Sequence, residues 1–158
     1  MHPKACFSCL WADPQQNIQH SPPRRIVAID YGQKRAGIAV TDELQLIASG
    51  LTTVHVKDIW DFLRQYVAEE DVECFVVGQP KDMQNRPSDA SRFIEPFVGK
   101  LIKTFPGIAV ERFDERFTSK MAHDTMIEGG LKKHKRQDKA LVDKISATIL
   151  LQSYMQTK

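Results

Sequence analysis

Long hydrophobic runs are missing from this 158-residue chain. No apolar stretch approaches the ~20 residues that a membrane-spanning helix needs. The amino terminus also lacks the continuous apolar core of a secretory signal. We therefore expect a cytoplasmic protein with no membrane partner. The formal net charge is only +2, so overall charge says little about the partners of the chain.

Cysteine is scarce, and the three cysteines of the chain do not suggest a disulfide framework. Cys74 lies in an apolar run and is predicted to be a small buried hydrophobic residue. Cys6 and Cys9 form an isolated C-x-x-C pair. A redox motif would need a strand and a helix around the pair, and a zinc site would need two more ligands. We expect these two thiols to be incidental.

Residues 1–23 differ from the rest of the chain in composition. They contain Asp13-Pro14 and Ser21-Pro22-Pro23, and no hydrophobic periodicity is sustained across them. We predict a flexible N-terminal extension over residues 1–23 and a single domain over residues 24–158. A domain of that length can bury a substantial core.

Hydrophobic periodicity predicts the order of elements in this domain. Strands are expected in a hairpin over 26–42, within 44–56, over 72–77 and over 108–113. Helices are expected over 58–69, 88–104, 118–128 and 138–156, with Phe93, Phe97, Leu101 and Ile102 on the apolar side of the second. A helix between two apolar runs implies a crossover and parallel pairing. We therefore predict an α/β fold with a mixed five-stranded sheet, in which a three-stranded antiparallel meander is extended by two parallel strands and flanked by helices.

Several acidic residues stand where such a fold could bring them together. Asp30 ends the first strand, and Asp114 and Glu115 end the last, at what should be the same edge of the sheet. Asp143 lies beside the apolar face of the last helix, where an uncompensated charge would be costly. Asp138 is a weaker candidate, because an acid at a helix start is explained by the helix dipole.

Oxygen ligands without a matching cysteine or histidine cluster suit Mg²⁺ or Mn²⁺. An ion shared by Asp30, Glu115 and Asp143 could activate a water molecule and stabilise the departing oxygen in phosphodiester cleavage. This chemistry requires the three carboxylates to converge.

Basic residues beside these acids could hold phosphates. Lys34 and Arg35 follow Asp30, and Arg116 follows the acids of the last strand. The alternative is that Asp30 caps a turn between solvated basic residues, and that residues 114–116 are a solvated strand end with a local ion pair. The residues alone do not distinguish phosphate binding from this solvated arrangement.

Four motifs occur in order along the domain. They are DYGQKRAGIAVTD (30–42), VVGQP (76–80), DERFT (114–118) and KALVDKISA (139–147). Together they resemble the YqgF (RuvX) family of Holliday junction resolvases, which are also described as nucleases that mature pre-16S rRNA. The chain departs from the family pattern at residues 81–85, where many members have an Asp-Gly turn.

The resemblance covers about residues 24–154 and implies a ribonuclease H-like fold. It puts Asp30, Glu115 and Asp143 at the family's acidic positions, as catalytic and metal-binding residues. The implied function is a divalent-metal-dependent endonuclease that processes the 5′ end of pre-16S rRNA in ribosome biogenesis. The alternative substrate is branched DNA, cleaved as a Holliday junction in recombination and repair. Either a monomer or a homodimer is compatible with these functions.

Two other functions match parts of the pattern. Actin-like ATPases and sugar kinases also place a phosphate loop between two strands after an Asp-x-Gly. This chain, however, is too short for their second domain and lacks a second glycine-rich phosphate loop. A nucleic-acid-binding module without chemistry is the other alternative, and the presence of all three acids argues against it.

Overall fold

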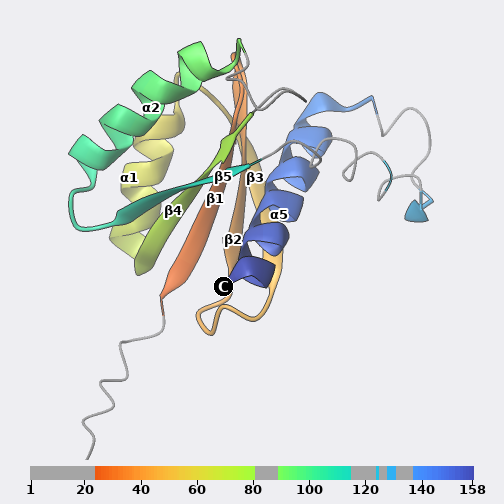
Figure 1. Cartoon of the computed structure of the whole chain (residues 1–158), viewed down its shortest axis with the longest axis horizontal. Helices are drawn as coiled ribbons and strands as arrows, with labels where there is room; N and C mark the ends of the chain where they lie inside the picture. Colours follow the sequence, from red (N-terminus) through yellow and green to blue (C-terminus); the bar gives the residue numbers. More distant parts are fainter. Residues whose placement is uncertain (1–23, 81–88, 115–123, 125–127, 131–136) are drawn as a thin grey trace, which may run out of the picture.

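The computed structural model describes residues 24–80, 89–114, 124, 128–130 and 137–158. Its centre is a five-stranded sheet of order β3-β2-β1-β4-β5. The strands are β1 (Arg25–Tyr31), β2 (Arg35–Thr41), β3 (Ala48–His55), β4 (Val72–Gln79) and β5 (Ala109–Asp114). β1, β2 and β3 form an antiparallel meander, and β4 and β5 run parallel to β1 (Figure 1). The predicted mixed sheet is confirmed.

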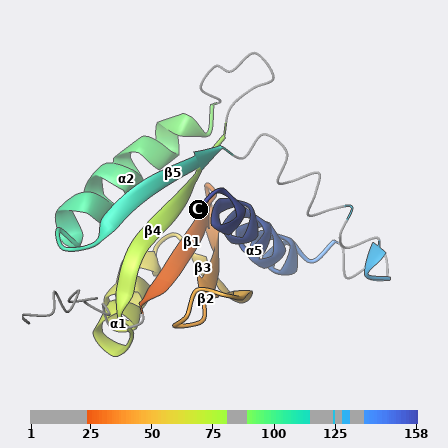
Figure 2. The same ribbon diagram turned by 60° about the horizontal axis from the view of Figure 1, so that its bottom comes forward.

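Helices cover both faces of this sheet. α1 (Ile59–Glu69) and α2 (Ser91–Thr104) lie on one face, and α5 (Lys139–Thr157) lies on the other (Figures 1 and 2). The helix predicted over 118–128 falls largely outside the described residues. Within the described part of the chain, none of the helices combines the length and the apolar character that crossing a membrane requires.

The central strand β1 is apolar on both sides. Val27 and Ile29 belong to the core beneath α1 and α2, whereas Ile26 and Ala28 belong to the core beneath α5. Such a strand reads as a continuous apolar run, as expected for one covered on both faces. Because successive side chains of a strand alternate between faces, Asp30 lies on the side of α5.

The buried face of α2 corrects one prediction. Phe93 and Ile102 are about half exposed, at 48% and 51%, so they are not on the core side. The buried residues follow the i, i+3, i+4, i+7 spacing from a different starting point: they are Ile94, Phe97, Val98 and Leu101. The prediction is confirmed for Phe97 and Leu101. The predicted apolar face was rotated by about one residue because two large apolar side chains, Phe93 and Ile102, lie beside the buried face.

The third strand also begins later than its apolar content indicates. The Asp42 carboxylate accepts hydrogen bonds from the backbone N–H groups of Leu46 and Ile47, at 2.7 and 2.8 Å. These bonds close a turn over residues 42–47 and hold that backbone out of the sheet. Both side chains are consequently exposed.

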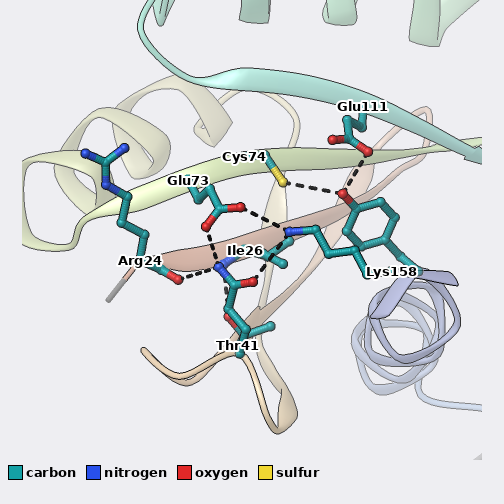
Figure 3. Close-up of polar contacts among 9 residues, drawn as sticks. Arg24, Ile26, Thr41, Glu73, Cys74, Glu111 and Lys158 are labelled. Carbon is teal, nitrogen blue, oxygen red and sulfur yellow. Dashed lines mark hydrogen bonds and ion pairs between the residues drawn. The ribbon is translucent and has the colours of Figure 1, made fainter. Parts of the chain in front are cut away.

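Polar contacts hold the carboxyl-terminal half of α5 against the sheet (Figure 3). The buried Tyr154 donates its hydroxyl to Glu111 Oε2 at 2.7 Å, and Cys74 Sγ lies 3.9 Å from the same hydroxyl. Lys158 Nζ contacts Glu73 Oε1 at 3.0 Å. Burial and the bond to Glu111 raise the pKa of Tyr154. Cys74 is buried, as predicted. Together, these contacts fix α5 against β4 and β5.

Candidate active site

Two carboxylates from distant parts of the sequence lie together on the α5 side of the sheet. Asp30 is the penultimate residue of β1, and Asp143 lies in the second turn of α5. Burial raises the pKa of Asp30 from 3.8 to about 6, and the negative charge of Asp143 adds to this effect. Two acids that repel one another in a partly desolvated place favour a proton or a cation between them.

A glycine makes this approach possible. Gly37 on β2 is the register partner of Asp30 on β1, and α5 passes directly over it. A Cβ atom at Gly37 would overlap the backbone carbonyl of Asp143. Gly37 was not among the predicted site residues, although a glycine inside a strand is a recognised signal that another backbone comes close.

A second glycine and a threonine extend this close packing along α5. A Cβ atom at Gly50 of β3 would lie 2.7 Å from Lys144 Cγ and 2.8 Å from Thr148 Oγ1. Thr53 Oγ1 donates to the Ala140 carbonyl at 2.6 Å. The amino-terminal half of α5 is therefore held over β2 and β3, and Asp143 is held with it.

Arg35 bridges the hairpin and the helix. Its Nε donates to Asp143 Oδ2 at 2.8 Å, and both side chains are partly exposed. The sequence predicted that Lys34 and Arg35 would lie beside Asp30, whereas the charged partner of Arg35 is Asp143. The hairpin still supplies a cation to the two-acid cluster, because Asp30 and Asp143 are neighbours.

A surface cavity of about 290 Å³ opens beside this ion pair. It is lined by Gly32, Gln33, Lys34, Arg35, Lys139 and Asp143. Lys139, the first residue of α5, is a third cation at this place and was missed by sequence reasoning. Its proximity to the hairpin depends on how α5 lies on the sheet, which no local pattern encodes.

Asp138 has the structural role predicted for it. It is the N-cap of α5, and its side chain accepts hydrogen bonds from the backbone N–H groups of Ala140 and Leu141. A carboxylate occupied in this way satisfies the first turn of the helix. Asp143 is therefore the acid of α5 that lies in the candidate site.

The remaining predicted site residues, Glu115 and Arg116, lie outside the described residues. The strand that leads to them does reach the correct edge, because Asp114 is the register partner of Gln79 at the end of β4. Within the described ranges, no three His, Cys, Asp or Glu residues form a group that could hold a metal ion. Two oxygen donors, Asp30 and Asp143, are placed together there.

Tyr31, which follows Asp30, packs rather than facing a ligand. Its ring stacks on Phe97 of α2 with centroids 4.1 Å apart, on the face of the sheet opposite α5. The Tyr31 ring therefore packs at the margin of the core beneath α1 and α2. Cys6 and Cys9 lie outside the described residues.

The model of the RuvX family, described as Holliday junction resolvase, matches residues 24–157. This chain belongs to the RuvX family. Among similar RuvX relatives, a protein of Flavobacterium psychrophilum is 59% identical over 134 residues, covering 85% of this chain and 98% of its own length. A protein of Bacteroides thetaiotaomicron is 60% identical over 134 residues, covering 85% and 97%. Both carry the name "Putative pre-16S rRNA nuclease".

Solved structures show the same fold at low sequence identity. RuvC of T. thermophilus, solved with a Holliday junction substrate, has a TM-score of 0.52 at 18% identity, covering 85% of this RuvX chain and 97% of its own. The fowlpox virus Holliday junction resolvase has a TM-score of 0.51 at 15% identity, covering 85% and 99%. The predicted ribonuclease H-like fold is confirmed. As a RuvX member the chain is a nuclease, so the predicted enzyme class is confirmed as well.

Proposed function

We propose that this chain is a divalent-metal-dependent endonuclease that hydrolyses phosphodiester bonds of structured nucleic acid. The observation that carries the proposal is the meeting of Asp30 and Asp143 at the carboxyl edge of the parallel strands, with the pKa of Asp30 raised to about 6. Cations beside these acids, at Lys34, Arg35 and Lys139, suit a substrate that carries a phosphate backbone.

Asp30 and Asp143 would hold Mg²⁺ or Mn²⁺, because hard divalent cations prefer carboxylate oxygens. When bound, such an ion supplies an activated water molecule and stabilises negative charge on the phosphate oxygens. The chain itself contributes the positions of the two acids, which are fixed by close packing at Gly37. The basic side chains would orient the phosphates that flank the scissile bond.

Glu115 is the third acid of this proposal. Side chains of β5 alternate between the two faces of the sheet, and both Glu111 and Phe113 contact Tyr154 of α5. Asp114 lies on the opposite side of the strand. If the alternation of β5 continued by one residue, position 115 would face α5, as Asp30 does, which supports Glu115 over Asp114. Arg116 would then be a phosphate ligand.

The substrate that we propose is the 5′ end of pre-16S rRNA, processed in the cytoplasm during ribosome biogenesis. The names of the relatives at 59–60% identity support this choice. Branched DNA is the second candidate, supported by the description of the family and by the resolvases that share the fold. Both substrates present the same phosphodiester to the acids.

The proposal is tested with purified full-length chain and two substrates, a pre-16S rRNA fragment with its 5′ leader and a four-way DNA junction. Cleavage is measured with Mg²⁺, with Mn²⁺ and with EDTA. We expect metal-dependent cleavage of the RNA, lost in Asp30→Asn and in Glu115→Gln and retained in the control Asp61→Asn, whose side chain is largely exposed on α1.

Other outcomes separate the alternatives. Cleavage of the junction alone would assign the DNA substrate. Tight binding without cleavage in any metal would identify a non-catalytic module and would refute the enzyme. Sedimentation velocity of the same samples distinguishes the monomer from the homodimer, which symmetric cleavage of two strands would require.

A further inference from the structure

The edge of the sheet opposite the candidate active site carries exposed apolar side chains. Leu44, Leu46 and Ile47, in the turn between β2 and β3, are 70%, 71% and 64% exposed. Beside them is a cavity of about 470 Å³, the amino-edge cavity, lined by Leu46, Ile47, Ala48, Gln152, Met155 and Gln156. No charged residue is among these six. Four of the six are apolar and two, Gln152 and Gln156, are glutamines, so the cavity can receive apolar side chains while its amides pair with backbone groups.

The turn presents these side chains through its own hydrogen bonds. Asp42 accepts from the N–H groups of Leu46 and Ile47, and Gln45 adopts a left-handed backbone conformation with φ of 55°. The bonds lower the pKa of Asp42, so the turn is held closed at neutral pH. The apolar surface is therefore preorganised, which reduces the entropy that binding would cost.

The chain outside the described domain joins it beside this cavity. Gln45 Nε2 donates to the Arg24 carbonyl at 2.9 Å and to Glu73 Oε2 at 2.6 Å, and Glu73 in turn contacts Lys158 (Figure 3). Residue 24 is thus tied to the residue that precedes Leu46. The described domain therefore begins, at residue 24, next to the amino-edge cavity.

Those 23 residues contain one compact apolar stretch, Phe7-Ser8-Cys9-Leu10-Trp11, which carries no charge. We propose that residues 7–11 bind in the amino-edge cavity. The residues between Trp11 and Arg24 can span about 40 Å when extended, so the tether allows residues 7–11 to return to a cavity beside residue 24. A short tether of this kind gives an effective concentration of about a millimolar, so a weak intrinsic affinity is sufficient.

This proposal does not depend on the nuclease proposal. The amino-edge cavity lies at the start of β1, whereas Asp30 lies near the end of that strand. Substitutions in the cavity therefore leave the candidate active site unchanged, and the thermal unfolding midpoint is the control for correct folding.

Trp11 is the reporter for the test, because the chain has only one other tryptophan, Trp60. In full-length protein with Trp60→Phe, we expect blue-shifted Trp11 emission and severalfold weaker acrylamide quenching than in the same protein with Ile47→Glu. Ile102→Glu is the matched control, since Ile102 is similarly exposed but lies on α2. Trp11 quenching that is the same with and without Ile47→Glu would overturn the proposal.

A reciprocal measurement guards against a local effect of the new charge. In full-length protein with ¹³C-methyl methionine, Trp11→Ser should shift the Met155 resonance, whereas Gln16→Ala in the same segment should not. Protection of Trp11 that increases with protein concentration would assign the cavity to a second copy of the chain and would overturn the intramolecular contact. An unshifted Met155 resonance in Trp11→Ser would also overturn it.

Discussion

A methyl group on Gly37 would occupy the place of the backbone carbonyl of Asp143. Gly37 is also the register partner of Asp30 on the neighbouring strand. One glycine therefore sets how closely the helix that carries one acid can approach the strand that carries the other. The candidate active site depends on the absence of a side chain as much as on the carboxylates themselves.

We expect Gly37→Ala to displace α5 and to reduce nuclease turnover at least tenfold. Because the clash is with backbone, the helix must move, and overpacking of this kind costs about 1–3 kcal/mol of stability. Turnover with saturating metal and thermal unfolding measure the two effects. The matched control is Gly99→Ala, where a Cβ atom would meet nothing within 4 Å. Equal turnover in the two variants would show that α5 tolerates the displacement.

Asp30→Asn should abolish cleavage and yet stabilise the metal-free protein at pH 8. The pKa of Asp30 is raised from 3.8 to about 6. Between these pH values the folded state therefore binds a proton that the unfolded state has lost. The contribution of Asp30 to the free energy of unfolding therefore falls as pH rises from 3.8 to about 6. Above that window the ionised carboxylate still destabilises the folded state. Removing the charge should restore about 1–3 kcal/mol, at ~1.36 kcal/mol per pKa unit.

The measurement is urea unfolding in EDTA at pH 8 and at pH 3.5. Most of the gain should disappear at the lower pH, where Asp30 is protonated in the folded chain and largely protonated in the unfolded chain. Asp61→Asn, on the exposed surface of α1, serves as the control and should change stability little at either pH. An equal gain at both pH values would contradict the explanation from charge.

Lys139→Ala should weaken binding of nucleic acid and reduce its dependence on salt. If Lys139 contacts a phosphate, removing it should lower the slope of log K against log salt by about 1. Fluorescence anisotropy in Ca²⁺ measures binding. Lys103→Ala provides a comparison, because Lys103 is an exposed lysine on the opposite layer. An unchanged slope in Lys139→Ala would remove this residue from the binding surface.

Tyr154→Phe should lower the free energy of unfolding by about 1 kcal/mol, the usual net value of a hydrogen bond. The hydroxyl donates to Glu111 Oε2 at 2.7 Å across the interface of α5 and β5. A double-mutant cycle with Glu111→Ala, which removes the acceptor, isolates this contact from other effects of each change. A coupling energy indistinguishable from zero would mean that the bond contributes nothing to holding α5.

The fold was predictable because its strands and helices differ in period. β1 and β4 are short apolar runs, α1 has the 3.6-residue spacing, and the alternation of the two implies parallel pairing. Errors arose where apolar residues do not contribute to the hydrophobic core. Leu46 and Ile47 were assigned to a strand, but hydrogen bonds to Asp42 keep them in a turn.

The candidate site was predictable only in its acids. Asp30 is visible as a charge that ends an apolar strand, and Asp143 as a charge beside an apolar helix face. Lys139 was missed because its role depends on the distance between α5 and β2, which is a property of tertiary packing. Gly37 carried a signal, as a glycine inside a strand, but the backbone that approaches it is set by the same packing. The partner of Arg35 was missed for the same reason, since the ion pair with Asp143 joins residues far apart in the sequence.

Gln45 links the first and last residues of the described domain. Its amide nitrogen donates to the Arg24 carbonyl, and its oxygen lies 3.5 Å from Lys158 Nζ. A few glycines could therefore join residue 158 to residue 24, and the chain could be reopened in the connection between β3 and α1. Such a circular permutant would place both new termini at the carboxyl edge, because Val56 N donates to the Lys34 carbonyl at 3.1 Å and His55 is the register partner of Arg35. Fluorophores on these termini would stand far from the join and would report directly on the candidate active site.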